Sequence, residues 1–404
     1  MELTVDTCDG AVKAAGGKSP RPTGALAKAP RIAIVHDYLN QRGGAERVVA
    51  ALHGMWPEAP IYTSIVDYNK LLPELKGADI RPSWMQKLPG VLKRFKLYLP
   101  FYAGAIESFD LKGYDIIISS SSAFAKGARK GMGALHVCYC YTPMRFVWDF
   151  ERYTEKEKIP FPLKYILPFF IRRLRKWDID TKDRPDYYIA ISTIVQKRIQ
   201  AVYGKDSAII FPPVEVRRFE PSGMAGDFYL IVSRLNAYKC IDIAIGAFNI
   251  LKLPLKVVGE GDHKGVLQAM AGPTVEFLGH VADDELERLY STCKAMIFPG
   301  EEDFGLAPLE ANAAGRPVIA FMAGGAIDTV IHGQTGIFFK ERSARSLMES
   351  VAAFEQGKYK FDPAKLRAHA LGFDRAVFER KMRAFVDEKY RSMVTSQENL
   401  GVRS

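Results

Sequence analysis

Short apolar runs that stop at polar residues recur along the chain and constrain its fold more than any other feature. They are continuous rather than alternating, which is typical of strands buried on both faces of a parallel sheet. Helical patterns such as 45–55 and 283–293 lie between them. This alternation predicts an α/β fold with doubly wound sheets. The runs lie at 31–37, 114–120, 135–141, 187–192, 208–213, 228–234, 255–261, 294–300 and 316–320.

A proline-containing segment, "FPPVEVRRFEP" at 211–221, divides the runs into two sets. A chain of 404 residues is also too long for one ordinary core. We therefore expect two Rossmann-like domains facing across a cleft, at 31–213 and 214–375. Residues 1–30 show no periodicity and predict a disordered tail. Residues 376–404 predict a helix that returns to the N-terminal domain.

The composition is typical of a soluble globular protein, with 48% hydrophobic and 25% charged residues, and we expect it in the cytoplasm. The apolar run at 165–171 is far shorter than the roughly 20 residues of a membrane span. The first ten residues are acidic and lack an apolar core, so no secretory signal is expected. The cysteines are few and scattered, which predicts free thiols in a reducing compartment and no metal site. They are Cys8, Cys138, Cys140, Cys240 and Cys293.

The formal net charge of +10 is concentrated in two segments that mix cations with bulky apolar residues. Residues 81–105 and 159–177 each hold five Lys or Arg and no acid. Cations beside aromatic rings suit an anionic lipid surface, so we expect peripheral binding to the inner membrane. An ordinary basic face is the alternative. Nucleic acid fits less well, because the rest of the chain indicates another ligand.

Three loops that follow predicted strands could bind a ligand at the carboxyl edge of a sheet. Gly43 and Gly44 lead into a helix, where free N–H groups suit an anion. Arg234 ends a strand and Lys239 precedes a helix, a pair of cations suited to a diphosphate. Gly259 follows another strand and permits close approach of a ring or a phosphate. Each signal is weak alone, since tight turns and surface cations are common.

A fourth loop contains two glutamates separated by seven residues, in "FPGEEDFGLAPLEANAAGRPVIA" at 298–320. Pro308 fits the first turn of a helix that starts near Leu306, and Gly315 fits its end. Glu302 then lies on the loop before the helix and Glu310 about one turn into it. The helix dipole alone favours acids at such a position, so Glu310 taken by itself is ambiguous.

Together these segments resemble retaining GT-B glycosyltransferases of family 4, also called group 1. The resemblance rests on "EEDFGLAPLE" with its Glu302-x7-Glu310 spacing, on "SRL" with Arg234 and Lys239, and on "VVGEGD". It continues through "VEFLGHVADDELERLYSTCKAMIFPGEEDFG" and covers nearly the whole chain after residue 31. The N-terminal segments "HDYLNQRGGAERV", "YDIIISSSSAFAKG" and "YTPMRFVWD" are similar to the O-antigen and exopolysaccharide mannosyltransferases of that family.

The resemblance implies a role for each loop in binding a nucleotide sugar. Arg234 and Lys239 would contact the donor diphosphate, and Glu302 the hydroxyls of the transferred sugar. Glu310 would bind the ribose. The amides of Phe304, Gly305 and Leu306 would hold the distal phosphate, with the glycine loop at Gly43 and Gly44 and the loop at Gly259 beside the nucleotide. No metal or other cofactor is implied, because side-chain cations and a helix end offset the charge of the leaving group.

One position departs from the family. Relatives read Cys-His-Thr-Pro-Met-Arg where this chain reads Cys140-Tyr141-Thr142-Pro143-Met144-Arg145. Tyr141 offers a hydroxyl donor but keeps its proton near neutral pH, so it can hydrogen-bond a sugar but not titrate. Four further residues are candidates for the acceptor side, namely His36, Lys126, Arg145 and Asp149.

These observations predict transfer of mannose from GDP-mannose to a polyprenyl-diphosphate-linked saccharide in the synthesis of cell-surface polysaccharide. A nucleotide-sugar 2-epimerase is an alternative that explains Glu302 poorly. A degenerate, non-catalytic sugar-binding protein is another, motivated by Tyr141. The sequence does not fix the base, the sugar or the linkage.

Overall fold

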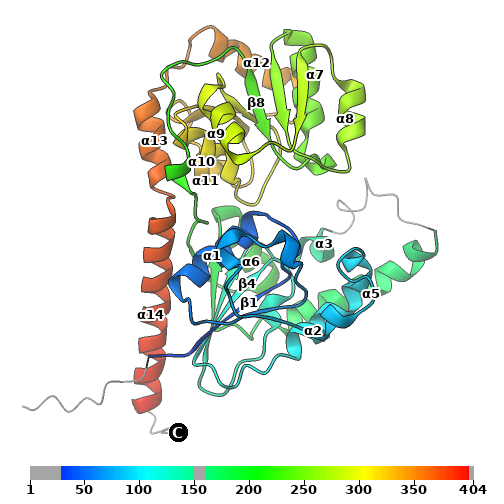
Figure 1. Ribbon diagram of the computed structural model, residues 1–404, viewed down its shortest axis with the longest axis vertical. Coiled ribbons are helices and arrows are strands. Elements are labelled where there is room, and N and C mark those ends of the chain that lie inside the picture. The colour runs from blue at the N-terminus through cyan, green and yellow to red at the C-terminus, as the bar shows by residue number, and fades with distance from the viewer. Residues whose placement is uncertain (1–28, 150–160, 400–404) are drawn as a thin grey trace, which may run out of the picture. The chain divides into compact units, whose positions relative to one another are not determined.

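The structure is a computed structural model that describes residues 29–149 and 161–399, without side chains for 161–166. It contains two parallel sheets with helices packed against them, one in each half of the chain (Figure 1). The predicted doubly wound α/β class is confirmed. The domain limits drawn from the sequence stay predictions. Most of the predicted tail and the last five residues lie outside the described residues.

The N-terminal sheet has seven parallel strands in the order β3-β2-β1-β4-β5-β6-β7. The order reverses between β1 and β4, so the loops after these two strands diverge and leave a crevice where such sheets bind ligands. The strands are β1 (Ile32–His36), β2 (Ile61–Thr63), β3 (Ile80–Pro82), β4 (Ile116–Ser121), β5 (Leu135–Cys140), β6 (Tyr187–Ala190) and β7 (Ser207–Ile209).

The helices of the N-terminal half include two that matter for the site. Gly43 caps the first of them, α1, in an extended conformation, and Ser192 caps α6 with a side-chain hydrogen bond to Val195 N. The helices are α1 (Gly44–Met55), α2 (Tyr102–Glu107), α3 (Arg145–Trp148), α5 (Phe161–Asp180) and α6 (Thr193–Tyr203).

The C-terminal sheet repeats this topology with six parallel strands in the order β10-β9-β8-β11-β12-β13. Its reversal lies between β8 and β11, the strands that precede Arg234 and Glu302. The strands are β8 (Tyr229–Val232), β9 (Leu255–Val258), β10 (Val275–Gly279), β11 (Met296–Phe298), β12 (Val318–Phe321) and β13 (Gly336–Phe339).

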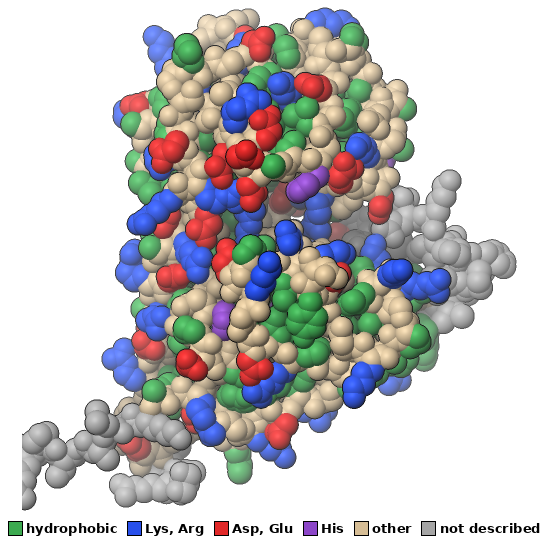
Figure 2. Space-filling view, in the orientation of Figure 1, with side chains coloured by type: hydrophobic (Ala, Val, Ile, Leu, Met, Phe, Trp, Pro, Cys, Tyr) green, Lys and Arg blue, Asp and Glu red, His purple; other side chains and the backbone are tan. Residues whose placement is uncertain are grey.

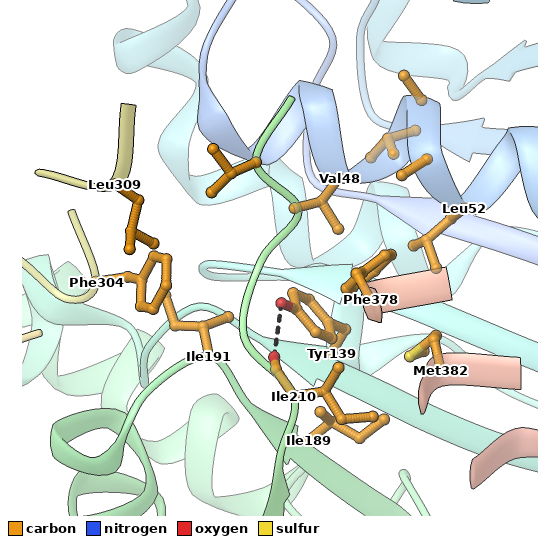
Figure 3. Close-up of a cluster of buried hydrophobic side chains, with 14 of the residues drawn as sticks. Val48, Leu52, Tyr139, Ile189, Ile191, Ile210, Phe304, Leu309, Phe378 and Met382 are labelled. Atoms are coloured by element: carbon orange, nitrogen blue, oxygen red, sulfur yellow. Dashed lines mark hydrogen bonds between the residues drawn. The ribbon is translucent and has the colours of Figure 1, made fainter. Parts of the chain in front are cut away.

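Helices of the C-terminal half pack mainly on the second sheet, and the last one extends further. They are α7 (Ile241–Leu251), α8 (Lys264–Met270), α9 (Asp283–Thr292), α10 (Leu306–Ala313), α11 (Ala326–Thr329), α12 (Ala344–Glu355), α13 (Pro363–Leu371) and α14 (Arg375–Asn399). The long helix α14 contacts α1 and β5 of the N-terminal half. Phe378 of α14 packs edge-on against Tyr139 of β5 with 5.7 Å between the ring centroids, beside Met382 (Figure 3).

The segment at 211–221 is more tightly packed than its prolines suggest. Val216 and Phe219 are fully buried, and Phe211 stacks on Phe304 with 5.6 Å between the ring centroids. The backbone of Val214 also bonds to that of Phe373 and Arg375. The segment therefore packs into the apolar cluster that includes Phe304 and Leu309 (Figure 3).

Four strands were absent from the sequence prediction, and each has a physical reason. Strands β2 and β3 are only three residues long, and β3 includes Pro82 at a sheet edge, where a missing N–H is tolerated. Strands β10 and β13 form the two edges of the second sheet. Glu276 interrupts β10, and β13 has only four residues, so neither forms a long continuous apolar run.

Candidate active site

Glu302 and Lys239 meet at the carboxyl edge of the C-terminal sheet. Glu302 lies in the loop after β11, and Lys239 ends a short 3-10 turn after β8. The Lys239 ammonium forms an ion pair with the Glu302 carboxylate. Lys239 is almost buried, with 8% of its surface exposed, so this charge is poorly solvated. Two residues separated by 63 positions in the chain are therefore brought together as the sequence predicted for one site.

Glu310 lies in α10 and uses both carboxylate oxygens. Tyr290 donates a 2.8 Å hydrogen bond to Oε2, and Arg47 of α1 donates a 3.1 Å hydrogen bond to Oε1. Burial, then the Glu310 charge, raises the pKa of Tyr290 well above its ordinary value, so the phenol stays a donor. A ribose hydroxyl at Glu310 would compete with Arg47 for Oε1. Sequence reasoning missed Arg47, whose position next to "GGAE" was its only signal.

The first turn of α10 presents backbone amides with no acceptor. Gly305 caps the helix with φ of +87°, a conformation that favours glycine. Within the described residues, the N–H groups of Phe304, Gly305 and Leu306 donate no hydrogen bond. Gly44 lies beside this turn, since a Cβ on Gly44 would be 3.2 Å from Leu306 Cδ1. The two helix N-termini proposed to hold phosphate are thus close to each other.

The glycine at position 259 has a structural reason that the sequence did not reveal. Its φ is +129°, and a Cβ there would overlap the carbonyl oxygen of Ser233. The close approach is therefore between two backbone segments, after β8 and after β9. A role of Gly259 toward the nucleotide stays a prediction. Arg234 follows this contact, is exposed, and makes no side-chain bond within the described residues.

Asp303, between Glu302 and Phe304, connects the loop after β11 to two arginines of the N-terminal half. Arg145 Nη1 lies 3.2 Å from Asp303 Oδ2, and Arg198 of α6 also pairs with this carboxylate. Ser192 Oγ donates to the Asp303 carbonyl. Arg145, predicted for the acceptor side, thus lies next to the predicted sugar-binding loop, and its Nη2 and Nε groups make no bond within the described residues.

Tyr141 and His36 are linked by hydrogen bonds through Ser120. Tyr141 follows β5, Ser120 lies in β4, and His36 is the last residue of β1. Tyr141 OH lies 2.7 Å from Ser120 Oγ and donates to Ala45 O at 3.1 Å. His36 Nδ1 lies 3.0 Å from Ser120 Oγ and 3.1 Å from Ser120 O. Because a carbonyl only accepts, the Nδ1 of His36 carries a proton that it donates to Ser120. Burial raises the pKa of the Tyr141 phenol well above its ordinary value.

The expectation that Lys126 binds the acceptor is corrected by its position. Lys126 is buried with 1% of its surface exposed. Its ammonium lies 3.2 Å from Asp178 Oδ1 and donates 2.7 Å hydrogen bonds to Asp178 O and Thr181 Oγ1. Asp178 lies in α5 and Thr181 directly follows this helix, so the end of α5 encloses the lysine. No acceptor reaches this ammonium, so its role is structural.

Two further carboxylates at this edge differ in their surroundings. Asp37, which the sequence did not single out, accepts hydrogen bonds from the backbone N–H groups of 122–125 and orders the loop after β4. Asp149 follows α3 and is the last described residue before the gap at 150–160. Among the described residues, no group of three His, Cys, Asp or Glu side chains gathers as metal ligands.

The two sheets and the loops at their carboxyl edges define a GT-B fold. Comparison with known proteins agrees: the structure of Anabaena HepE in complex with UDP superposes with a TM-score of 0.66 at 16% identity, covering 89% of this chain and 100% of HepE. Residues 215–370 match the model of the family described as Glycosyl transferases group 1. This match, together with the fold, confirms the resemblance to group 1 glycosyltransferases seen in the sequence.

Two curated relatives match over part of their length. The D-rhamnosyltransferase WbpZ of Pseudomonas aeruginosa is 29% identical over 188 residues, which are 43% of this chain and 49% of WbpZ. The GDP-mannose-dependent alpha-(1-6)-phosphatidylinositol monomannoside mannosyltransferase of Mycobacterium tuberculosis is 29% identical over 202 residues, which are 42% of this chain and 52% of the relative. The chain thus matches about half the length of each.

Proposed function

We propose that this protein is a retaining glycosyltransferase that moves a sugar from a nucleotide donor to a lipid-linked saccharide. The observation that carries the proposal is the Lys239–Glu302 ion pair, formed in the loop that leads into α10, the helix that also carries Glu310. One cation and three unpaired amides suit a diphosphate, while two carboxylates suit sugar and ribose hydroxyls. All of them lie within the residues that match the group 1 family.

The donor we favour is GDP-mannose. One relative carries GDP-mannose in its name, and both relatives are named transferases, which favours transfer over the epimerase alternative. A UDP-sugar is the second candidate, since the structure of HepE contains UDP.

The chemistry proposed for the site needs no dedicated protein base. Lys239 and the amides of 304–306 would stabilise the charge that develops on the departing diphosphate. The acceptor hydroxyl would attack from the face that the diphosphate leaves, and a diphosphate oxygen would take its proton. Glu302, released from Lys239 by the donor phosphate, would orient the hydroxyls of the sugar. Arg234, exposed beside this site, is available to the same diphosphate.

The acceptor proposal rests on Arg145 and on the surface of the N-terminal half. Arg145 keeps two guanidinium nitrogens available for an anion such as a lipid-linked diphosphate. Trp84, Leu97 and Phe101 are exposed in the basic segment 81–105, beside the exposed Lys93, Arg94 and Lys96. Hydrophobic side chains gather in the lower half of Figure 2, with Lys and Arg at their edges.

This surface supports peripheral binding to an anionic inner leaflet. None of the described helices is long and apolar enough to cross a membrane. Part of the second basic segment, 159–177, lies outside the described side chains. Vesicles of phosphatidylglycerol should bind the protein more weakly when Lys93, Arg94 and Lys96 become glutamine, by about 1 kcal/mol per charge. Equal binding of the triple variant would remove the membrane proposal.

Incubation with GDP-mannose, UDP-glucose and UDP-N-acetylglucosamine, each without acceptor, tests the donor proposal. We expect slow release of GDP from GDP-mannose, and a Glu302→Gln variant that is about 10- to 100-fold slower through loss of a charged hydrogen bond. Release from a UDP-sugar alone would make the GDP-mannose assignment wrong. No release from any donor, even with added lipid-linked saccharide, would favour a non-catalytic protein.

A further inference from the structure

The hydroxyl of Tyr141 is committed to the protein backbone. It lies 3.1 Å from Ala45 O and 2.7 Å from Ser120 Oγ. Because the carbonyl of Ala45 can only accept, the single phenol proton is directed to it. Ser120 then donates to the phenol oxygen and accepts from His36 Nδ1. The residue that replaces the family's histidine is therefore tied to α1 through its only donor.

The first turn of α1 has few other anchors. Gly43 caps the helix and offers no side-chain hydrogen bond. Glu46 stands where a capping-box acid would reach back to the backbone, yet both of its carboxylate oxygens are buried without a hydrogen-bond partner. In the described parts of the chain, Tyr141 provides the only side-chain hydrogen bond to the backbone of 43–46. This bond holds the turn that carries the paired glycines.

The position of this turn sets the space beside α10. A Cβ on Gly44 would lie 3.2 Å from Leu306 Cδ1, which is tighter than an ordinary contact. Leu306 begins α10. Within the described residues, its N–H group and those of Phe304 and Gly305 donate no hydrogen bond. A shift of α1 by a few tenths of an ångström would change the separation of two helix N-termini, both of which favour phosphate.

We propose that Tyr141 is a positioning residue of the nucleotide-diphosphate site, holding Gly43 and Gly44 against α10 through Ala45. This inference rests on the proposed function and deepens it. It gives Tyr141 no contact with the reacting sugar, in contrast to the sequence expectation that the phenol hydrogen-bonds a sugar hydroxyl. The histidine of the relatives is thus replaced by a side chain with a different task.

Tyr141→Phe removes the hydroxyl alone, and Tyr139→Phe is its matched control. Tyr139 lies two residues earlier in β5, is fully buried and donates a 2.9 Å hydrogen bond to the Ile210 carbonyl. Calorimetric titration uses GDP or UDP, whichever binds the wild type more tightly. We expect Tyr141→Phe to weaken this affinity about five- to tenfold, the effect of one buried hydrogen bond. Tyr139→Phe should lower the thermal midpoint but keep the affinity within twofold.

Tyr141→His separates the two roles of this residue. An imidazole is shorter than a phenol and does not reach Ala45 O, so we expect the same loss of nucleotide affinity as in Tyr141→Phe. A side chain that contacts only the sugar would leave nucleotide affinity unchanged in both variants, and that result overturns the inference. Equal losses in Tyr139→Phe would also overturn it. A wild type that binds neither nucleotide would instead overturn the proposed function itself.

Discussion

Individual residues of the candidate site are arranged as pairs of opposite charge. Lys239 pairs with Glu302, and Arg47 with Glu310. A nucleotide sugar carries phosphates, which can take the place of a carboxylate beside a cation. It also carries hydroxyls, which can take the place of the cation as hydrogen-bond donors to a carboxylate. The pairs compensate the nearly buried charges of Lys239 and Glu310, which explains how the protein tolerates them.

The buried ion pair of Lys126 leads to a prediction about stability. Lys126→Met should destabilise the N-terminal domain by about 3–5 kcal/mol, because it leaves the Asp178 carboxylate buried with one charge unpaired. Urea unfolding followed by tryptophan fluorescence measures this, since all four tryptophans, Trp56, Trp84, Trp148 and Trp177, lie in that half.

The control for this variant is Lys176→Met. Lys176 forms an exposed ion pair with Asp180 in the same helix, so we expect a change below about 0.5 kcal/mol. A Lys126→Met variant as stable as the wild type would contradict the structural role and return Lys126 to the acceptor site.

Sequence reasoning predicted that Glu302 and Lys239 lie close together, and it missed other contacts for a common reason. Glu302 and Lys239 follow strands of one sheet, so their proximity follows from topology alone. Arg47, Asp303 and Tyr290 contact residues far away in the chain. Their partners depend on how helices pack, and a single sequence carries no signal for that. The prediction for Lys126 was wrong for the same reason, because helix α5 packs over this side chain.

Helices and strands were predicted where local sequence determines them and missed where distant residues do. Buried parallel strands such as β1, β5 and β11 were predicted because their apolar runs are local. The edge strands β3, β10 and β13 were not, since their pairing depends on neighbours. Helix α10 was anticipated from Pro308 and Gly315, and Gly315 does adopt a φ of +74° just after its end.

A substitution of Gly305 tests whether the start of α10 requires a glycine. Gly305→Ala should destabilise the protein by about 1–3 kcal/mol and weaken nucleotide binding, because φ is +87° and the new Cβ would lie 2.7 Å from Phe298 Cζ. Gly265→Ala is the control, inside α8 with nothing within 4 Å, and should gain about 0.5–1 kcal/mol. Thermal unfolding compares them. Equal stability of the two variants would mean that the cap of α10 does not require glycine.

Across the whole molecule, stability should depend on pH through His136 in the central strand β5. Burial lowers the pKa of His136 to about 3, and Nε2 lies 2.8 Å from Ser119 Oγ. Unfolded histidine titrates near pH 6.5, so the unfolded chain gains a proton that the folded chain does not. The stabilising contribution is present above pH 6.5 and declines as the pH falls from there toward 3.

From this we predict that the wild type loses about 2 kcal/mol more than His136→Gln between pH 7 and pH 5, by urea unfolding at each pH. His280→Gln, at an exposed histidine, should behave like the wild type. Parallel pH profiles of the wild type and His136→Gln would contradict a neutral, buried His136.

The proposed function requires that Lys239 and the first turn of α10 bind the diphosphate of a nucleotide sugar. Calorimetric titration of GDP into the wild type, Lys239→Gln and Lys264→Gln tests it most directly. Lys264 is the first residue of α8 and forms an ion pair with Glu260 of the preceding loop. We predict at least about tenfold weaker binding by Lys239→Gln and no more than a twofold change in Lys264→Gln. Equal affinity of Lys239→Gln and the wild type, for GDP and for UDP, would contradict the claim.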